Sequence, residues 1–309
     1  TDPTYDKKQF ETILEIKGRE EHDKLIQLLN DVNNYDIAIE DVVKHHFIED
    51  NILTWLAVNI LMDNMDTDAN NFYLYSPLNI DKWLILPWDY DDGWNNGRKN
   101  ENFHPYRSGI SNYWGNELIN RYFRQQANVD KLTAKIEELY ANYINEETVR
   151  EQLERYKHIP VPHINRFPDA QYLPIKANSY DAEIQEIIET PKNSLERYYA
   201  DLQAPKPFYQ SNIAEFENNA HVFKWDASFD LQGGAIYYDV IIAEDPALTN
   251  VVASKTHIRE TAISVPNLTT GKYYMKVTVE DEEGHKNSAF DQYRNDDGNY
   301  FGVIEVEAQ

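Results

Sequence analysis

Apolar residues recur at helical spacing through the first part of the chain. This spacing predicts helices at about residues 20–33 and 50–63, and Asp41 to Glu49 is a further helical candidate. After Trp114 the same spacing returns in three sets, which are Leu118 to Phe123, Leu132 to Tyr140 and Val149 to Tyr156. The Pro-rich stretch Ile159 to Pro168 then interrupts the helical pattern.

Between these two helical regions the apolar pattern changes to that of strands. Phe72 to Tyr75 is a short aromatic run that Ser76 and Pro77 end, and Trp83 to Trp88 is a second apolar run. The polar turn Leu78 to Lys82 joins the two runs, so together they predict a β-hairpin. This hairpin separates two clusters of acidic residues.

Two prolines, Pro205 and Pro207, end the last predicted helix near Leu202 and stiffen a linker, so we expect a domain boundary between residues 205 and 206. The remaining residues are strand-like, in the runs Val222 to Trp225, Ala235 to Ala243, Val251 to Lys255, Ala262 to Val265, Lys272 to Glu280 and Tyr300 to Glu305. Several short strands over about 100 residues predict a β-sandwich. The expected fold class is α+β, with a mostly helical domain over 1–205 and an all-β domain over 206–309.

The predicted sandwich is similar to fibronectin type III modules of the immunoglobulin-like class. The segment from Leu268 to Val277 resembles their tyrosine-bearing strand, and Trp225 stands where these modules keep a core tryptophan. We therefore expect a fibronectin-like domain that acts as a spacer or a contact module.

Composition narrows the choice of partners and compartment. The chain of 309 residues carries 29 Lys plus Arg against 53 Asp plus Glu, a net charge of −24 that repels polyphosphate backbones. Nucleic acid is therefore not expected as a partner. The absence of Cys excludes disulfides, thiolate metal ligands and a cysteine nucleophile. No apolar run approaches the roughly 18 residues of a membrane span, and the N-terminus lacks the order of a signal peptide, so we expect a soluble chain.

The acidic clusters have the order of a phosphoryl-transfer site. Such a site needs one carboxylate to take the proton of the acceptor, and further carboxylate or amide oxygens to hold magnesium. In protein kinases the catalytic Asp precedes a metal-binding Asn by five positions, and a second metal-binding Asp follows a short strand pair. Here Asp66 precedes Asn71 by 71 − 66 = 5 positions, and the hairpin leads to Asp89, which follows Asp66 by 89 − 66 = 23 positions.

Three fragments in the same order resemble the spore coat protein H (CotH) family of atypical protein kinases. They are Asn64-Met65-Asp66, Asn71-Phe72-Tyr73-Leu74-Tyr75 and Pro87-Trp88-Asp89-Tyr90-Asp91. The resemblance implies a protein kinase that transfers the γ-phosphate of ATP to Ser or Thr of a protein, with magnesium and ATP as cofactors. It implies that Asp66 is the general base, that Asn71 and Asp89 bind the metal and nucleotide, and that Asp91 lies at the metal site or supports it.

This resemblance covers roughly residues 1–205 and corresponds to the large, C-terminal lobe of a kinase. Nothing between Thr1 and Asp50 has the pattern of a small β-rich lobe with a nucleotide-contacting lysine. We therefore expect that the N-terminal lobe is missing, and that this chain is a fragment with half of the ATP cleft.

Other interpretations of the same residues remain open. Asp and Asn between residues 63 and 71 are also common turn formers, although that reading does not explain Asp89. An EF-hand starting at Asp66 would need Gly where Asn71 stands and Glu where Pro77 stands, so it is disfavoured. Large aromatics beside strands are usually core residues, and we expect this of the three tryptophans Trp83, Trp88 and Trp94. Scattered histidines are expected at the surface or at helix caps, namely His45, His46, His104 and His163.

The alternative function is a non-catalytic module of a cell surface or coat, in which a pseudokinase-like scaffold makes structural or binding contacts with assembly partners. The predicted sandwich favours an extracellular, bacterial cell-surface location. The resemblance to CotH favours the spore coat.

Overall fold

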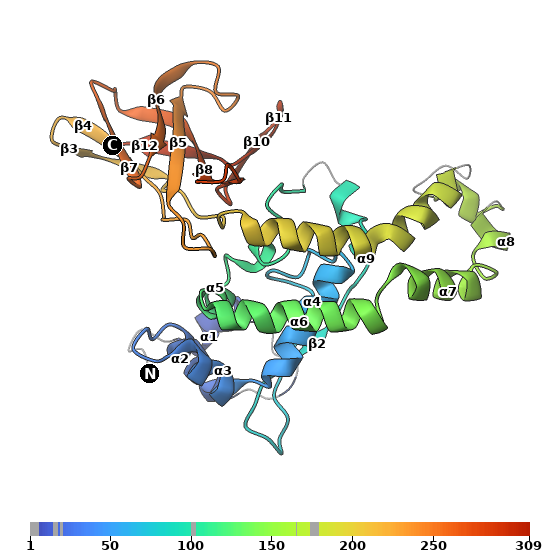
Figure 1. The fold of residues 1–309 in the computed structure, drawn as a ribbon. Coiled ribbons are helices and arrows are strands. Elements are labelled where there is room, and N and C mark those ends of the chain that lie inside the picture. Colours follow the sequence, from blue (N-terminus) through green and yellow to red (C-terminus); the bar gives the residue numbers. More distant parts are fainter. Residues whose placement is uncertain (1–5, 15–17, 19–20, 100–102, 165, 174–178) are drawn as a thin grey trace.

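The computed structural model describes residues 6–14, 18, 21–99, 103–164, 166–173 and 179–309. It has the predicted α+β character, with a helical part that contains one β-hairpin, followed by a β-rich part (Figure 1). The helices are α1 (Lys7–Phe10), α2 (Asp23–Val32), α3 (Ile39–His46), α4 (Glu49–Leu61), α5 (Glu117–Phe123), α6 (Gln126–Asn142), α7 (Glu146–Tyr156), α8 (Val161–Ile164) and α9 (Tyr180–Gln203).

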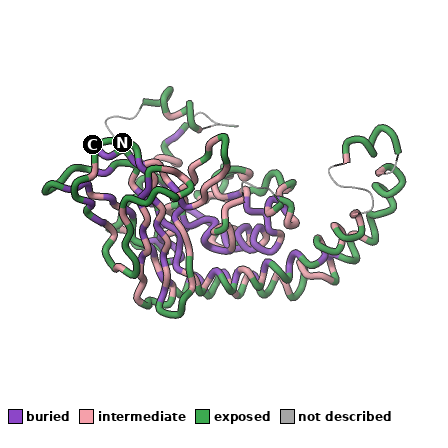
Figure 2. Tube along the Cα trace, turned by 90° about the horizontal axis from the view of Figure 1, so that it is seen from above, coloured by how far each residue is buried: buried purple, intermediate pink, exposed green. Residues whose placement is uncertain are grey.

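Helix α4 is the centre of the helical core, because apolar side chains cover most of its circumference. It packs against α6 and α9, and its buried residues include Ile52, Leu56 and Ile60. The tube coloured by burial shows a buried interior in the middle of the molecule, while α7, α8 and the first half of α9 extend away as an exposed arm (Figure 2). The core thus fixes the C-terminal end of α4, where the acidic segment begins.

The predicted hairpin is confirmed. Strands β1 (Phe72–Tyr75) and β2 (Leu84–Pro87) pair antiparallel, with Tyr73 opposite Leu86. The side chain of Asn51 in α4 accepts a hydrogen bond from the N–H of Ile85 at 2.7 Å and donates one to its carbonyl at 3.2 Å. This pair of bonds attaches β2 to the central helix.

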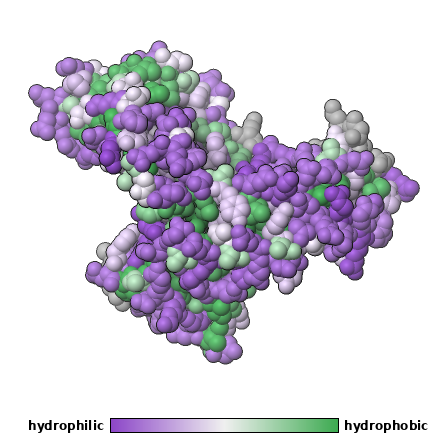
Figure 3. All heavy atoms as spheres, in the orientation of Figure 1, coloured by the Kyte–Doolittle hydropathy of each residue, from purple (hydrophilic) through white to green (hydrophobic). Residues whose placement is uncertain are grey.

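The inner face of the hairpin meets the helical core, and its outer face is open. Phe72 packs against Trp55 with ring centroids 5.3 Å apart, whereas Tyr73 and Trp88 are exposed. The connection between the strands forms a hydrophobic patch at the lower tip of the molecule in Figure 3, where Leu78 is 80% exposed.

The β-rich part contains strands β3 (Ile213–Glu217), β4 (Ala220–Lys224), β5 (Ile236–Ala243), β6 (Val251–Ile258), β7 (Ala262–Pro266), β8 (Gly271–Asp281), β9 (Lys286–Ser288), β10 (Gln292–Asn295), β11 (Gly298–Phe301) and β12 (Val303–Ala308). The main sheet has the order β6-β5-β8-β12-β3-β4-β7, with β9 beside β8, and it nearly closes into a barrel. The parallel pair β12 and β3 joins its two halves. Strands β10 and β11 form a separate two-stranded sheet.

One predicted strand is divided in the structure. The apolar run Tyr300 to Glu305 predicts a single strand, but β11 ends at Phe301 and β12 begins at Val303. Gly302 lies between them with φ +73°, a conformation that glycine adopts without steric cost and that bends the chain out of one ladder into another.

Two separate clusters of buried apolar residues correspond to the two parts of the chain. The helical cluster includes Leu56 and Phe123, and the β-rich cluster includes Phe223, Val240 and Met275. Three residues of the β-rich part, Phe229, Leu231 and Phe290, nevertheless pack against the helical cluster. The placement of a boundary between residues 205 and 206 stays a prediction.

The structure was also searched for membrane-spanning helices. No helix within its described residues combines the length and the apolar character needed to cross a bilayer.

Candidate functional site

The acidic segment follows directly on the C-terminal end of α4. Its first carboxylate, Asp63, has φ +53° and is buried. Arg98 donates to both of its oxygens, from Nε at 2.6 Å and from Nη2 at 2.8 Å, and Nη2 of Arg197 lies 3.3 Å away. Asn64 is fully buried and donates to the side-chain oxygen of Asn59 at 3.1 Å. Asp63 and Asn64 therefore hold the segment in place and are not exposed to a ligand.

Asp66 and Asn71 lie together, as their five-residue spacing predicts. The amide Nδ2 of Asn71 donates to the carbonyl oxygen of Asp66 at 2.9 Å and to its carboxylate Oδ2 at 3.0 Å. Asn71 has φ +59°, a left-handed conformation that asparagine tolerates better than most residues. Because both contacts use the amide nitrogen, the amide oxygen of Asn71 stays available as an acceptor or metal ligand.

The hairpin returns the chain to this place at Asp89. The N–H of Trp88 donates to the carbonyl of Asn71 at 3.1 Å, which closes the ladder at the acidic end of the hairpin. Asp89 itself has φ +52° and is exposed. A hydrogen bond with the Asp91 carboxyl and the charge of that group raise the pKa of Asp89, and the charge of Asp66 adds to this effect. The carboxylates of residues 66, 89 and 91 thus form one acidic group.

The donor set of this group fits magnesium in part. Carboxylate and amide oxygens are the ligands that hard divalent cations prefer, and paired carboxylates repel each other unless a proton or cation lies between them. Among the residues that the structure describes, no three His, Cys, Asp or Glu side chains are arranged to hold a metal ion by themselves. Magnesium is usually bound by one or two carboxylates together with substrate phosphates and water, so the available oxygens fit an open site of this kind.

Other charged residues surround this group and were not found from the sequence. Nη2 of Arg107 lies 3.6 Å from Asp68, and burial raises the pKa of Asp92, an effect to which the charges of Asp66 and Asp91 add. Arg107 follows Asp66 by about 40 positions without a motif, so no sequence signal relates the two residues. Only the path of the chain after the hairpin brings this arginine to the acidic segment.

Two predictions about aromatic and histidine residues are wrong. Trp88 is 57% exposed and packs its ring edge against Tyr73, whereas Trp83 packs against the helical core as predicted. His46 is buried, with Nε2 at 2.7 Å from Asp31, so it is neither a surface nor a capping residue. Trp88 packs beside Tyr73 on the open face of the hairpin, where Tyr73 is also exposed, so it does not join the core.

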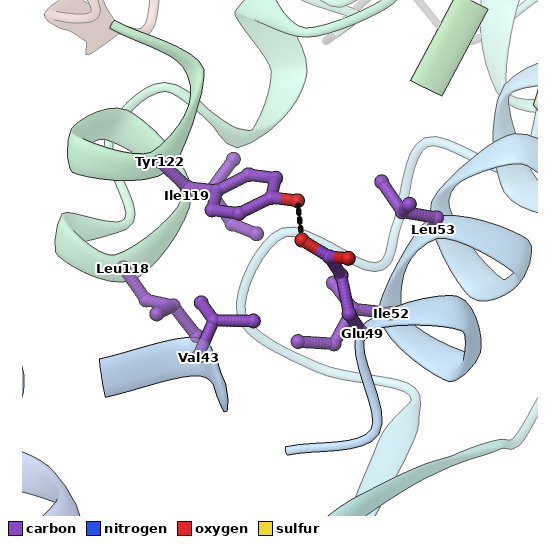
Figure 4. Close-up of a pocket in the computed structure, with 7 residues that line it drawn as sticks. All are labelled: Val43, Glu49, Ile52, Leu53, Leu118, Ile119 and Tyr122. Atoms are coloured by element: carbon purple, nitrogen blue, oxygen red, sulfur yellow. Dashed lines mark hydrogen bonds between the residues drawn. The ribbon is translucent and has the colours of Figure 1, made fainter. Parts of the chain in front are cut away.

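A separate apolar pocket lies between α3, α4 and α5. The side chains of Val43, Ile52, Leu53, Leu118 and Ile119 line it, and Tyr122 donates to Glu49 at 2.5 Å on one side (Figure 4). The hydrogen bonds that Glu49 accepts from Lys131 and Tyr122 outweigh its burial and lower its pKa. This pocket belongs to the packing of the helices and contains none of the predicted site residues.

Comparison with solved structures finds a likeness to the crystal structure of CopC from Methylosinus trichosporium OB3b, at 16% identity and a TM-score of 0.20, over 33% of this chain and 93% of that one. A likeness at this level says nothing about function. None of the curated proteins matches the chain significantly. The family model described as CotH kinase protein, by contrast, matches residues 1–196, which include the whole acidic group. The chain therefore belongs to the CotH kinase protein family.

Proposed function

We propose that the chain carries the large lobe of a CotH-type protein kinase, which transfers the γ-phosphate of ATP to a Ser or Thr hydroxyl of a protein with magnesium. The observation that carries this proposal is the contact of Asn71 with Asp66 beside the pair Asp89 and Asp91. These residues come from two segments, one before and one after the hairpin. Membership of the CotH kinase protein family over residues 1–196 supports a role for them in phosphate transfer.

Each residue has a separate task in this proposal. Asp66 accepts the proton of the acceptor hydroxyl. The hydrogen bond from Asn71 to Oδ2 of Asp66 orients this carboxylate, and the second one, to the carbonyl oxygen of Asp66, holds its backbone. Magnesium would be held by Asp89, Asp91 and the free amide oxygen of Asn71. Bound magnesium would neutralise the charge of the phosphates. The backbone is left-handed at both Asn71 and Asp89, and backbone strain of this kind is frequent at functional sites.

Two measurements on the chain test this proposal. Calorimetric titration is expected to detect ATP binding that requires magnesium and that is lost in Asp89→Asn. Transfer of labelled phosphate to a protein acceptor is expected to be lost in Asp66→Asn, which keeps the shape of the side chain but removes the base. Asp81→Asn is the matched control, because Asp81 is an exposed carboxylate outside the acidic group. Undiminished transfer by the Asp66 variant would refute its role.

A non-catalytic module is the second candidate function. The observation that favours it is the exposed apolar surface of the hairpin, where Tyr73, Leu78 and Trp88 are 38%, 80% and 57% exposed. Exposed apolar surfaces often mark the place where a partner binds. If magnesium-dependent ATP binding is absent, the chain is better explained as a pseudokinase-like scaffold of a surface or coat assembly.

For the β-rich part we propose a fibronectin type III-like domain, which supports an extracellular, bacterial cell-surface location over the spore coat. The support is a set of local features. Tyr273 donates its hydroxyl to the carbonyl of Thr269 at 3.0 Å, the bond of a tyrosine corner. Trp225 is buried in the core of this part. The strand order, with β4 between β3 and β7 and with β8 between β5 and β12, also fits this module. Secretion and cell fractionation of the native protein test the location.

A further inference from the structure

We infer that the β-rich part is a positioning domain for the segment that carries Asp66, through a bridging segment that both parts hold. The bridging segment is residues 103–113, which follow the acidic group and precede α5. Its regular structure is limited to one short 3-10 turn at Ser111–Tyr113, so tertiary contacts determine its conformation. The inference rests on the proposed function for its catalytic consequence, while the contacts themselves are independent of that function.

On one side the bridging segment holds the backbone around Asp66. Nδ2 of Asn112 donates to the carbonyl of Met65 at 2.9 Å, immediately before Asp66 in the chain. The hydroxyl of Tyr113 lies 2.7 Å from that of Thr67, immediately after it. Both contacts are buried, and each constrains a direct neighbour of the proposed base. A displacement of the bridging segment would therefore move Asp66.

On the other side the bridging segment contacts the β-rich part through aromatic rings. Tyr106 meets Phe290 edge-on at 4.9 Å, and His104 meets Phe301 edge-on at 5.0 Å. Edge-on aromatic pairs of this kind contribute about 0.5–1.5 kcal/mol each beyond the area that they bury.

The linker between the two parts fixes the same segment. Asp201, near the end of α9, accepts from the N–H of Ile110 at 2.8 Å and of Ser111 at 3.2 Å. Its other oxygen lies 3.2 Å from Nζ of Lys206, which is fully buried at the start of the β-rich part. Lys206 in turn donates its N–H to the carbonyl of Phe229 at 2.8 Å. Burial of a charged lysine is costly unless its charge is paired, and the partner of Lys206 is Asp201 in α9. The start of the β-rich part is therefore held against the helical part and is not a flexible spacer.

These contacts connect the β-rich part to the acidic segment on the side of Asp66. None of the contacts given above reaches Asp89 or Asp91, which the hairpin positions from α4. Loss of the β-rich contacts should therefore disturb Asp66 more than the proposed magnesium ligands Asp89 and Asp91. The expected effect is a lower rate of phosphate transfer at nearly unchanged affinity for ATP.

Hydrogen exchange on the full chain tests the structural half of the inference without any activity. In Phe290→Ala, exchange is expected to rise about tenfold in residues 103–113 and in residues 64–68, because both lose a shared restraint. Phe216→Ala is the matched control, since Phe216 is an exposed phenylalanine of the same part in β3. Phe290→Tyr keeps the ring and is expected to restore protection. Unchanged exchange at 64–68 in Phe290→Ala would overturn the inference.

Kinetics then test the functional half. Phe290→Ala is expected to lower the rate of phosphate transfer about tenfold at saturating ATP, with the dissociation constant of magnesium-ATP within about twofold of the unmodified chain. An equal loss of rate and affinity would contradict a positioning role. If the unmodified chain binds no ATP, the proposed function fails, while the exchange experiment still decides whether the β-rich part holds the acidic segment.

Discussion

The buried carboxylate of Asp63 offers a stability test that is worked from the structure. Its side chain is only 1% exposed and receives two hydrogen bonds from Arg98 and a third charge contact from Arg197. Burial lowers the pKa of Arg197, and the charge of Asp63 is the main influence that opposes this shift. The variant Asp63→Asn keeps the shape and leaves two partly buried guanidinium groups without their counter-charge.

The expected loss of stability follows from how deeply Arg98 and Arg197 are buried. Removing one partner of a buried ion pair costs about 3–5 kcal/mol, and the lower end applies because the two arginine side chains are 20% and 29% exposed. For a cooperative unit of about 200 residues, 1 kcal/mol corresponds to about 2–4 °C in the midpoint. We therefore expect Asp63→Asn to lower the thermal midpoint by about 6–12 °C.

Differential scanning calorimetry measures this shift, with Asp81→Asn as the control. Asp81 pairs with Lys24 at 3.2 Å but is 86% exposed, so its loss should cost under about 1 kcal/mol. The reasoning is refuted if the Asp63 variant melts within 2 °C of the Asp81 variant, because the arginines would then be adequately solvated without their partner.

Three further predictions concern the bridging segment and the β-rich part. Gly109→Ala should cost about 2 kcal/mol or more in denaturant unfolding, since Gly109 has φ +49° and a Cβ there would lie 2.6 Å from Asp201; an unchanged midpoint would contradict this. Tyr273→Phe should cost about 1 kcal/mol by the same measurement, because it removes the hydrogen bond to Thr269, and a neutral effect would exclude the tyrosine corner as a stabilising contact. Burial lowers the pKa of His104 in the folded chain. As the pH falls, the unfolded chain therefore binds a proton at this histidine before the folded chain does. The contribution of His104 to stability is present above about pH 6.5, the pKa of the histidine in the unfolded chain, and is lost as the pH falls below that value. Melting between pH 7 and pH 5 should show a decline that is smaller in His104→Gln, and equal declines would exclude this histidine as the cause.

Most of the secondary structure follows from local patterns. The period change at Phe72 and the stop at Ser76 and Pro77 predict β1 with its correct bounds, because the aromatic run between them is rich in strand formers. The sequence did not predict strand β3, Ile213–Glu217, because three of its five residues are Ala or Glu, which are depleted in strands. The break at Gly302 was also missed, because a single glycine in an apolar run indicates a bend only when its φ is known.

Membership of the acidic group could be predicted in the same local way. The spacings from Asp66 to Asn71 and to Asp89 are short. A hairpin between Asn71 and Asp89 brings its two ends together. The hydrogen bond from the N–H of Trp88 to the carbonyl of Asn71 joins these two ends. The roles of these residues in catalysis stay a prediction until they are measured.

The sequence by itself determined most of the elements, the acidic group and the family, because each of these depends on residues close together in the chain. Only the tertiary structure decided that Asp63 is an ion-paired anchor, that Trp88 is exposed, and that Asn112 and Phe290 connect the two parts. Such contacts join residues tens of positions apart and depend on how completed elements pack. No local pattern of hydrophobic and polar positions encodes the partner of a buried charge or ring, so the neighbours of the proposed base could be found only in the folded chain.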